Sequence, residues 1–245
     1  MLNSTNISAA TPSGSSTFTT DPAVLTAEGP YIIPWIATAR PALLNSELAH
    51  PIDSATRTST SCYMRGLKET ITLASTTGAP WMWRRICFTL KGDDLTLLTG
   101  NNFTWWRATT GQGVVRNLTN LFASANALNA FKSLVFQGTE QYDWANIFNA
   151  KLDTKRISVK YDRTRTFSSG NANGIIRNMR MWHPMNSNLM YDDDEIAGSV
   201  VTTPYSTDAK PGMGDYYVVD MFQGAGTAQD QLRLSIEAKL YWHEK

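Results

Sequence analysis

The sequence predicts an all-β fold in which two antiparallel sheets pack face to face, for three reasons. Most apolar runs are short, rich in Val, Ile, Thr, Tyr, Phe or Trp, and separated by turn-forming residues, as strands are. Residues 231–242 alternate apolar and polar side chains, so one face of this segment would be buried and the other exposed. The chain has 245 residues, which suffice for one all-β domain with a single core.

The first 53 residues are expected to form an extended N-terminal arm and strap. Residues 1–20 are rich in Ser, Thr, Asn and Gly, so we expect a flexible arm that drapes over the protein without packing. Five prolines between residues 21 and 53 interrupt the apolar runs, which favours an extended strap or a short edge strand and excludes a long helix. The remaining domain would span residues 54–245.

Eight candidate strands follow the strap, at residues 61–73, 81–90, 131–137, 156–167, 174–182, 188–196, 215–222 and 231–242. A short helix within a loop is expected over residues 118–134, where apolar residues recur near helical spacing and several Ala are present. Eight strands and long inter-strand loops predict an eight-stranded jelly-roll sandwich of two four-stranded antiparallel sheets. An immunoglobulin-like sandwich fits this length less well.

No active site is indicated by the sequence. Its three histidines, His50, His183 and His243, lie in no motif for nucleophilic catalysis, and the common phosphate-binding, dinucleotide-binding and zinc-protease motifs do not occur. Cys62 and Cys87 lie in strand-like runs without metal-ligand spacing, so we expect both to be buried as small hydrophobic residues. We expect a protein that is not an enzyme, with no catalytic residues, no metal and no cofactor.

Two further features concern ions and membranes. Residues 192–195 form an acidic run that could bind calcium, but adjacent carboxylates alternate in direction along an extended chain, so we expect a solvated acidic loop. Apolar runs stop well short of the ~20 residues of a membrane helix, and no secretory leader opens the chain. We therefore expect a soluble, intracellular protein with no membrane partner.

Basic residues are unevenly distributed, although the net charge is only +1. Residues 151–180 contain eight Lys or Arg against two Asp, which fits phosphate binding but also fits the solvated face of a sandwich. In residues 81–85, WMWRR, aromatic rings adjoin guanidinium groups, a mixture that favours either single-stranded DNA contact or packing between subunits. Strand alternation places Arg85 beside Trp81 and Trp83, so an Arg that shares a face with bulky apolar groups must pair, stack or reach solvent.

Several uncommon strings occur in order along the chain: SCYMRGLKETI and PWMWRRICFTLKG within residues 57–92, KRISVKYDRTRTF at 155–167, IIRNMRMWHP at 175–184 and LRLSIEAKLYWHE at 232–244. Together they resemble the capsid (coat) proteins of genomoviruses, small circular DNA viruses related to geminiviruses, over about the C-terminal three quarters of the chain. The resemblance implies a viral jelly-roll subunit that assembles with copies of itself into a small icosahedral shell around circular single-stranded DNA. It also implies a location in the virion and, during assembly, in the host cell nucleus.

One departure from that family changes where DNA would bind. Its members usually begin with an Arg- and Lys-rich arm for genome binding and nuclear import, whereas the first 39 residues here contain neither Arg nor Lys. Either the arm is missing from this chain, or the folded shell binds DNA through its inner surface alone. For the second case we predict a DNA-binding set of Arg57, Lys68, Arg84, Arg85, Lys155, Arg156, Lys160, Arg163 and Arg165.

Contacts between copies of the chain are expected to use aromatic side chains in or beside the loops. The candidates are Trp105, Trp106, Trp144, Tyr205, Tyr216 and Tyr217, each of which would otherwise pack within its own subunit. Two alternative functions stay open: a lectin-like β-sandwich, and a soluble single-stranded-DNA-binding protein that forms no shell.

Overall fold

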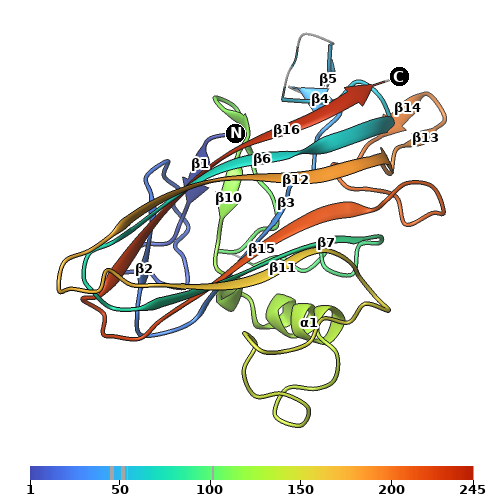
Figure 1. The fold of residues 1–245 in the computed structure, drawn as a ribbon. Helices are drawn as coiled ribbons and strands as arrows, with labels where there is room; N and C mark the ends of the chain where they lie inside the picture. Colours follow the sequence, from blue (N-terminus) through green and yellow to red (C-terminus); the bar gives the residue numbers. More distant parts are fainter. Residues whose placement is uncertain (45–46, 51–52, 54, 101, 245) are drawn as a thin grey trace.

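Two four-stranded antiparallel sheets packed face to face form the body of the protein (Figure 1). The computed structural model describes residues 1–44, 47–50, 53, 55–100 and 102–244. We name each sheet after one of its central strands. The β7 sheet has the order β11 (Ser158–Phe167), β7 (Trp81–Leu90), β15 (Asp215–Gly224), β3 (Tyr31–Ile36). The β6 sheet has the order β12 (Ile176–Met190), β6 (Ser61–Ser75), β16 (Gln231–Glu244), β2 (Ala23–Thr26).

The connectivity of these eight strands is that of a jelly roll. Counted along the chain, the β7 sheet contains strands five, four, seven and two, and the β6 sheet contains strands six, three, eight and one. Successive strands therefore cross repeatedly between the two sheets, as two interlocked Greek keys do. The predicted fold class is confirmed. The proline-containing segment contributes an outer strand to each sheet, β2 to the β6 sheet and β3 to the β7 sheet.

Shorter elements complete the described chain. They are β1 (Asn3–Thr5), β4 (Leu43–Leu44), β5 (Glu47–Leu48), β8 (Ala108–Thr109), β9 (Gly113–Val114), β10 (Arg116–Leu118), the 3₁₀ turn η1 (Leu121–Ala123), α1 (Ala125–Val135), β13 (Asp194–Ile196) and β14 (Ser199–Val201). None of the helices in the described residues is both long enough and apolar enough to cross a membrane.

Three sequence expectations about these elements are wrong. Residues 131–137 do not form a strand, because helix α1 continues to Val135. The Ser124 side chain caps the first turn of this helix, and its buried residues Ala127, Phe131 and Val135 recur every four positions. The helix is also shorter than residues 118–134, since Asn120 caps the separate 3₁₀ turn. The strand expected at residues 174–182 continues through a bulge between Pro184 and Ser187 to Met190 as one long strand, β12, and the end of the strand expected at residues 188–196 forms the separate strand β13.

The N-terminal arm is extended and packs against the domain, contrary to the expectation that it drapes without packing. Strand β1 pairs in parallel with β10, and residues 3–7 are buried. The polar side chains of this segment bond to backbone carbonyls: Asn3 donates to Asp21, and Thr5 donates to Leu118. Short polar side chains can thus hold an arm in place through hydrogen bonds where composition alone suggests disorder.

The outer faces of the two sheets differ. The stretch between β7 and β11 forms an insertion, and two parts of it, around Phe103 and Trp105 and over residues 121–157, cover the outer face of the β7 sheet with a second apolar layer. Phe131 of α1 and Trp105 belong to the same buried cluster as Phe88 and Tyr217 of the sheet. In Figure 1 α1 and the loop that follows it lie beyond β11 and β7, whereas β10 of the same insertion lies beside β1. The outer face of the β6 sheet instead carries exposed side chains along β6, β12 and β16. This is the open face of the protein.

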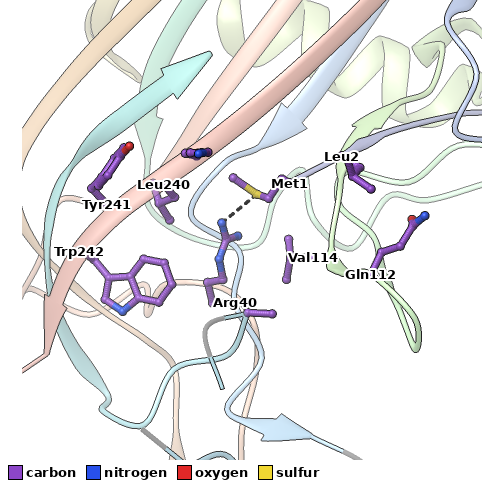
Figure 2. A pocket seen from close by; sticks show the side chains of 10 residues that line it. Met1, Leu2, Arg40, Gln112, Val114, Leu240, Tyr241 and Trp242 are labelled. Atoms are coloured by element: carbon purple, nitrogen blue, oxygen red, sulfur yellow. Dashed lines mark hydrogen bonds between the residues drawn. The ribbon is translucent and has the colours of Figure 1, made fainter. Parts of the chain in front are cut away.

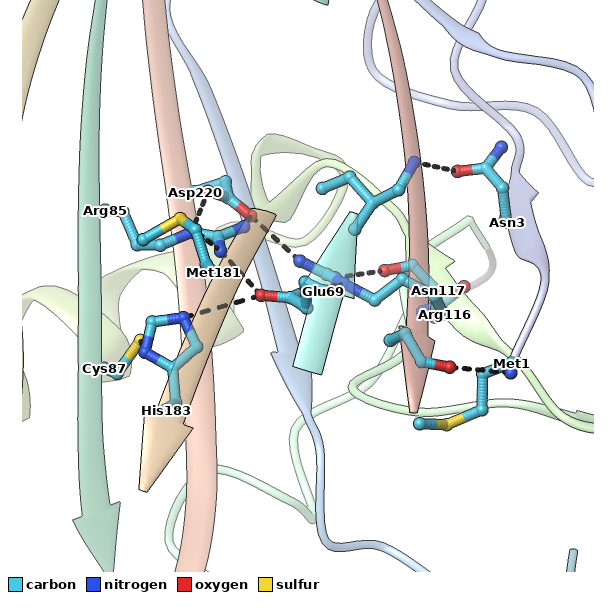
Figure 3. A network of polar contacts seen from close by, with 12 residues as sticks. Met1, Asn3, Glu69, Arg85, Cys87, Arg116, Asn117, Met181, His183 and Asp220 are labelled. Atoms are coloured by element: carbon cyan, nitrogen blue, oxygen red, sulfur yellow. Dashed lines mark hydrogen bonds and ion pairs between the residues drawn. The ribbon is translucent and has the colours of Figure 1, made fainter. Parts of the chain in front are cut away.

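A buried ring of four charged side chains crosses the space between the sheets (Figure 3). Arg85 of β7 binds Asp220 of β15 at 2.8 Å and Glu69 of β6 at 2.5 Å. Arg116 of β10 binds the same two carboxylates, at 2.8 Å to Asp220 and 3.0 Å to Glu69. The side chains are 0–1% exposed, and Trp83 Nε1 donates a further hydrogen bond to Asp220. The ring thus ties β6, β7, β10 and β15 together with balanced charge.

Arg85 behaves as strand alternation requires and not as a DNA contact. It lies on the same face as Trp81 and Trp83, with its guanidinium 5.3 Å from the Trp83 ring, and it is neutralised inside the core. Burial alone would raise the pKa of Asp220, but the charges of Arg85 and Arg116 and their hydrogen bonds hold it below its ordinary value. Of the expected alternatives, pairing, stacking or reaching solvent, the structure shows Arg85 paired with two carboxylates and next to the Trp83 ring, and its burial contradicts its assignment to the DNA-binding set.

Removing one charge from the ring should destabilise the fold strongly. We expect Asp220→Asn to lower the free energy of unfolding by about 3–5 kcal/mol, because it leaves a buried guanidinium uncompensated. The matched control is Glu237→Gln on the open face, which should change it by less than about 0.5 kcal/mol. Urea unfolding followed by circular dichroism measures both, and equal effects of the two variants would contradict a structural role for the ring.

His183 borders the ring and makes stability depend on pH. Its Nε2 lies 3.7 Å from Glu69, and burial together with the nearby Arg85 lowers the pKa of the imidazole from 6.5 to about 4. Between these two pH values the unfolded chain takes up a proton that the folded chain does not, so the folded state loses stability as the pH falls. At pH 7 this loss is absent.

We therefore expect His183→Gln to resist acid better than the natural chain. Between pH 7 and pH 4.5 the natural chain should lose roughly 2–3 kcal/mol more unfolding free energy than the variant does. Asp215, whose burial raises its pKa to about 6, titrates in both proteins and cancels in this comparison. Urea unfolding at both pH values measures these losses of unfolding free energy. Equal losses in the two proteins would show that His183 takes up its proton over the same pH range in the folded and unfolded chains, which contradicts its lowered pKa.

Candidate nucleic-acid interface

The open face of the β6 sheet gathers basic side chains from three strands. Strand alternation and the register between β12, β6 and β16 direct them away from the core. Five exposed side chains are basic: Arg65 and Lys68 on β6, Arg180 on β12, and Arg233 and Lys239 on β16. Glu237 is the one acidic side chain among the outward residues of these strands that the structure describes. We call this surface the basic face.

Register brings like charges together on the basic face. Lys68 and Lys239 are directly opposite each other on neighbouring strands, and Trp182 is opposite Lys68 on the other side. Like charges in opposed positions destabilise a sheet, so an anion that binds between the two ammonium groups relieves this repulsion. A row of Trp, Lys and Lys across three strands therefore places an aromatic ring beside two cationic side chains.

A pocket of about 410 Å³ adjoins the basic face where β16 passes the N-terminal segment (Figure 2). Lys239, Tyr241, Trp242 and Arg40 line part of it. The Arg40 guanidinium is buried and donates to the backbone oxygens of Ala37 and Ala39, and burial lowers its pKa to about 10. Since no carboxylate of the described residues pairs with Arg40, its positive charge adds to the potential at this end of the face.

Lys68 is the one member of the predicted DNA-binding set that lies on the basic face. Lys155, Lys160 and Arg163 are exposed, but they lie in or just before β11, at the edge of the other sheet. Arg165 of the same strand is partly buried, with its guanidinium 5.6 Å from the Trp83 ring. The structure therefore separates Lys68 from the β11 group.

Arg156, the remaining exposed member of the set, is used within the subunit. It donates to the backbone oxygen of Ser133 in α1 and lies 3.4 Å from Asp153. This contact links the start of β11 to the helical insertion. Its side chain is still 57% exposed, so Arg156 stays a predicted DNA contact.

Two more predicted DNA contacts are buried. Arg84 forms a two-point ion pair with Asp162 at 2.8–2.9 Å and donates to two backbone carbonyls of the insertion. Arg57 pairs with Asp193, and its guanidinium lies 4.0 Å from the Tyr191 ring. With Arg85, these arginines hold the subunit together, and burial removes them from the side chains that could reach DNA.

The aromatic residues predicted to form contacts between subunits also divide into buried and partly exposed side chains. Trp105, Tyr216 and Tyr217 are buried within the subunit, where Tyr217 stacks on Phe88 at 4.9 Å, so they cannot anchor a second copy in this fold. Tyr216 and Tyr217 lie in β15, which confirms the strand predicted at residues 215–222, and their burial there leaves them unavailable for a contact between subunits. Trp106, Trp144 and Tyr205 are partly exposed and stay predictions.

Sequence reasoning missed Arg65, Arg180, Arg233, Lys239, Trp182 and Tyr241 as one surface. The alternation of residues 231–242 already directs Arg233 and Lys239 away from the core. What it could not supply is the strand order, which places β16 beside β6 and β6 beside β12.

Metal binding and thiol chemistry have no visible site in the described residues. No three side chains of His, Cys, Asp or Glu are grouped there as metal ligands. In the acidic run, Asp193 is paired with Arg57, and Asp194 begins β13. Burial raises the pKa of both thiols, Cys62 and Cys87, to about 12, so both stay protonated at neutral pH.

No protein-family model matches this chain, and a search of curated proteins finds no similar sequence.

Binding assays can decide between the basic face and the β11 group. We expect the double variant Lys68→Gln/Lys239→Gln to bind a single-stranded oligonucleotide more weakly than the natural chain. The slope of log affinity against log salt concentration should also become less steep, by about 0.7 for each phosphate that the variant no longer neutralises. The control, Lys155→Gln/Lys160→Gln, removes the same charge from the β11 group and should have little effect. Fluorescence anisotropy at several salt concentrations measures both variants, and the reverse ranking would favour the β11 group.

Proposed function

We propose that this chain is a structural capsid protein that assembles into a small icosahedral shell around circular single-stranded DNA. The observation that carries the proposal is the asymmetry of the sandwich: the β7 sheet is covered by residues 121–157 and by the segment around Trp105, while the β6 sheet presents an open basic face. In the proposed shell the basic face lines the lumen, and the insertion with α1 faces outward. The folded domain itself would then neutralise part of the genome's charge.

The resemblance to genomovirus coat proteins supports the same function. The strings that carry it fall on strands of the sandwich: residues 57–92 include β6 and β7, residues 155–167 include β11, and the last two strings include most of β12 and β16. The similarity therefore lies in the framework that forms the basic face and the buried ring. Loops, which vary most between related proteins, do not carry it.

An exposed hairpin offers a contact between copies of the chain. Strands β13 and β14 pair only with each other among the described residues, and their side chains Ile196, Val200 and Val201 are 60%, 53% and 45% exposed. A two-stranded hairpin gains little stability alone, and grouped apolar side chains on a surface are typical of protein contacts. Repetition of such a contact around rotation axes closes a shell.

A charge on this hairpin should block assembly without unfolding the subunit. We expect Val200→Asp to give folded subunits that form no particles, because the carboxylate would be buried in the contact. Val200→Thr, which keeps the side-chain shape, should still assemble. Size-exclusion chromatography and negative-stain electron microscopy measure the outcome, and normal particles from Val200→Asp would exclude the hairpin as a contact.

Electron microscopy of the purified chain tests the proposed function. We expect closed particles of uniform size that protect single-stranded DNA from added nuclease. Particles should lose this protection when they are dissociated. Unassembled chains that bind a glycan would instead indicate a lectin-like protein, and unassembled chains that bind an oligonucleotide would indicate a soluble DNA-binding protein; either result overturns the proposal.

A further inference from the structure

Trp182 covers the neighbouring strand at a position where that strand contains a glycine. A Cβ atom on Gly66 would lie 2.5 Å from Cζ2 of the Trp182 indole and 2.8 Å from Cη2, so the ring occupies the space that a side chain would fill. Gly66 is in β6, between β12 with Trp182 and β16 with Tyr241. Three strands thus build one aromatic platform, with Gly66 as its floor.

The platform presents aromatic surface to solvent. Trp182 is 47% exposed and Tyr241 is 44% exposed, although large aromatic side chains are usually far more buried. Their ring centres are 5.8 Å apart and the ring planes are inclined by 60°, so the two rings touch without stacking on each other. Each residue keeps nearly half of its surface exposed and within reach of another ring.

Basic side chains surround the platform. Lys68 is directly opposite Trp182 in the register, Lys239 follows on the next strand, and Arg180 precedes Trp182 by two positions on the same face. A ligand with a flat ring and an adjoining negative charge fits this arrangement. An unpaired nucleotide has both, whereas the bases of a duplex are stacked on one another and cannot lie on a protein ring.

We propose that Trp182 and Tyr241 form a stacking site for an unpaired DNA base, while Lys68 and Lys239 bind the neighbouring phosphates. The site rests on the proposed function, in which this face meets the genome, and adds a preference for single-stranded over duplex DNA. The charges attract either form of DNA, and the platform distinguishes the two. A neutral glycan would also stack on an indole, but five basic side chains against one acidic one favour a polyanion.

Binding of oligothymidine and of a duplex of equal length, at equal salt, tests this site. Trp182→Leu keeps an apolar side chain but removes the ring, and we expect it to weaken oligothymidine binding roughly 5- to 100-fold with duplex binding unchanged. Trp182→Phe should retain most of the affinity, and Tyr241→Leu should weaken oligothymidine binding in the same selective way. Because no charge changes, the salt dependence of these variants should match that of the natural chain.

The possible outcomes separate the stacking site from the proposed function. If the natural chain binds oligothymidine and both Leu variants bind it equally well, or lose single-stranded and duplex binding together, the stacking site is wrong and the proposed function stands. If the natural chain binds neither form of DNA, the proposed function is wrong as well. Thermal unfolding of each variant shows whether the fold is kept, and Tyr241→Leu provides an independent test if Trp182→Leu does not fold.

Discussion

The ion pairs between Arg85, Arg116, Glu69 and Asp220 constrain most of this fold. Each of these side chains is buried, so each needs its partners in place, and an arrangement that separates them leaves a charge unpaired in the core. The four come from both sheets and from β10. The packing of the sheets, the position of β10 and, through β1, the ordered N-terminal segment therefore depend on one neutral cluster.

Arginine side chains serve two purposes in this protein: some form ion pairs inside the subunit, and others carry exposed charge. In β7, alternation directs Arg85 into the ring and Arg84 under the insertion, where Asp162 and backbone carbonyls bind it. With these arginines used in packing, the exposed positive charge lies in the β11 group and on the outer face of the β6 sheet, whose inner face supplies Glu69 to the ring. The inner face of β6 thus contributes a buried carboxylate to the stability of the fold, and its outer face carries positive charge that is proposed to bind the enclosed DNA.

Local sequence pattern predicted the class of fold, and pairing between distant strands decided the rest. Alternation in residues 231–242 and the count of apolar runs predict the jelly roll, and the same rule predicts that Arg85 pairs, stacks or reaches solvent. The partner Arg116 comes from a loop with no such pattern, and the apolar spacing of residues 131–137 fits a strand as well as a helix. The basic face depends on strand order, because Lys68, Trp182 and Lys239 are neighbours only in the folded sheet.

The central claim is that the subunit turns its basic β6 sheet toward an enclosed genome. An electron cryo-microscopy reconstruction of particles formed by the chain measures this orientation directly. We expect a closed shell in which Lys239 and Trp182 face the lumen and contact nucleic-acid density, while α1 faces outward. A shell with the β6 sheet on its outer surface, or a lumen whose nucleic acid contacts other surfaces instead, would contradict the account.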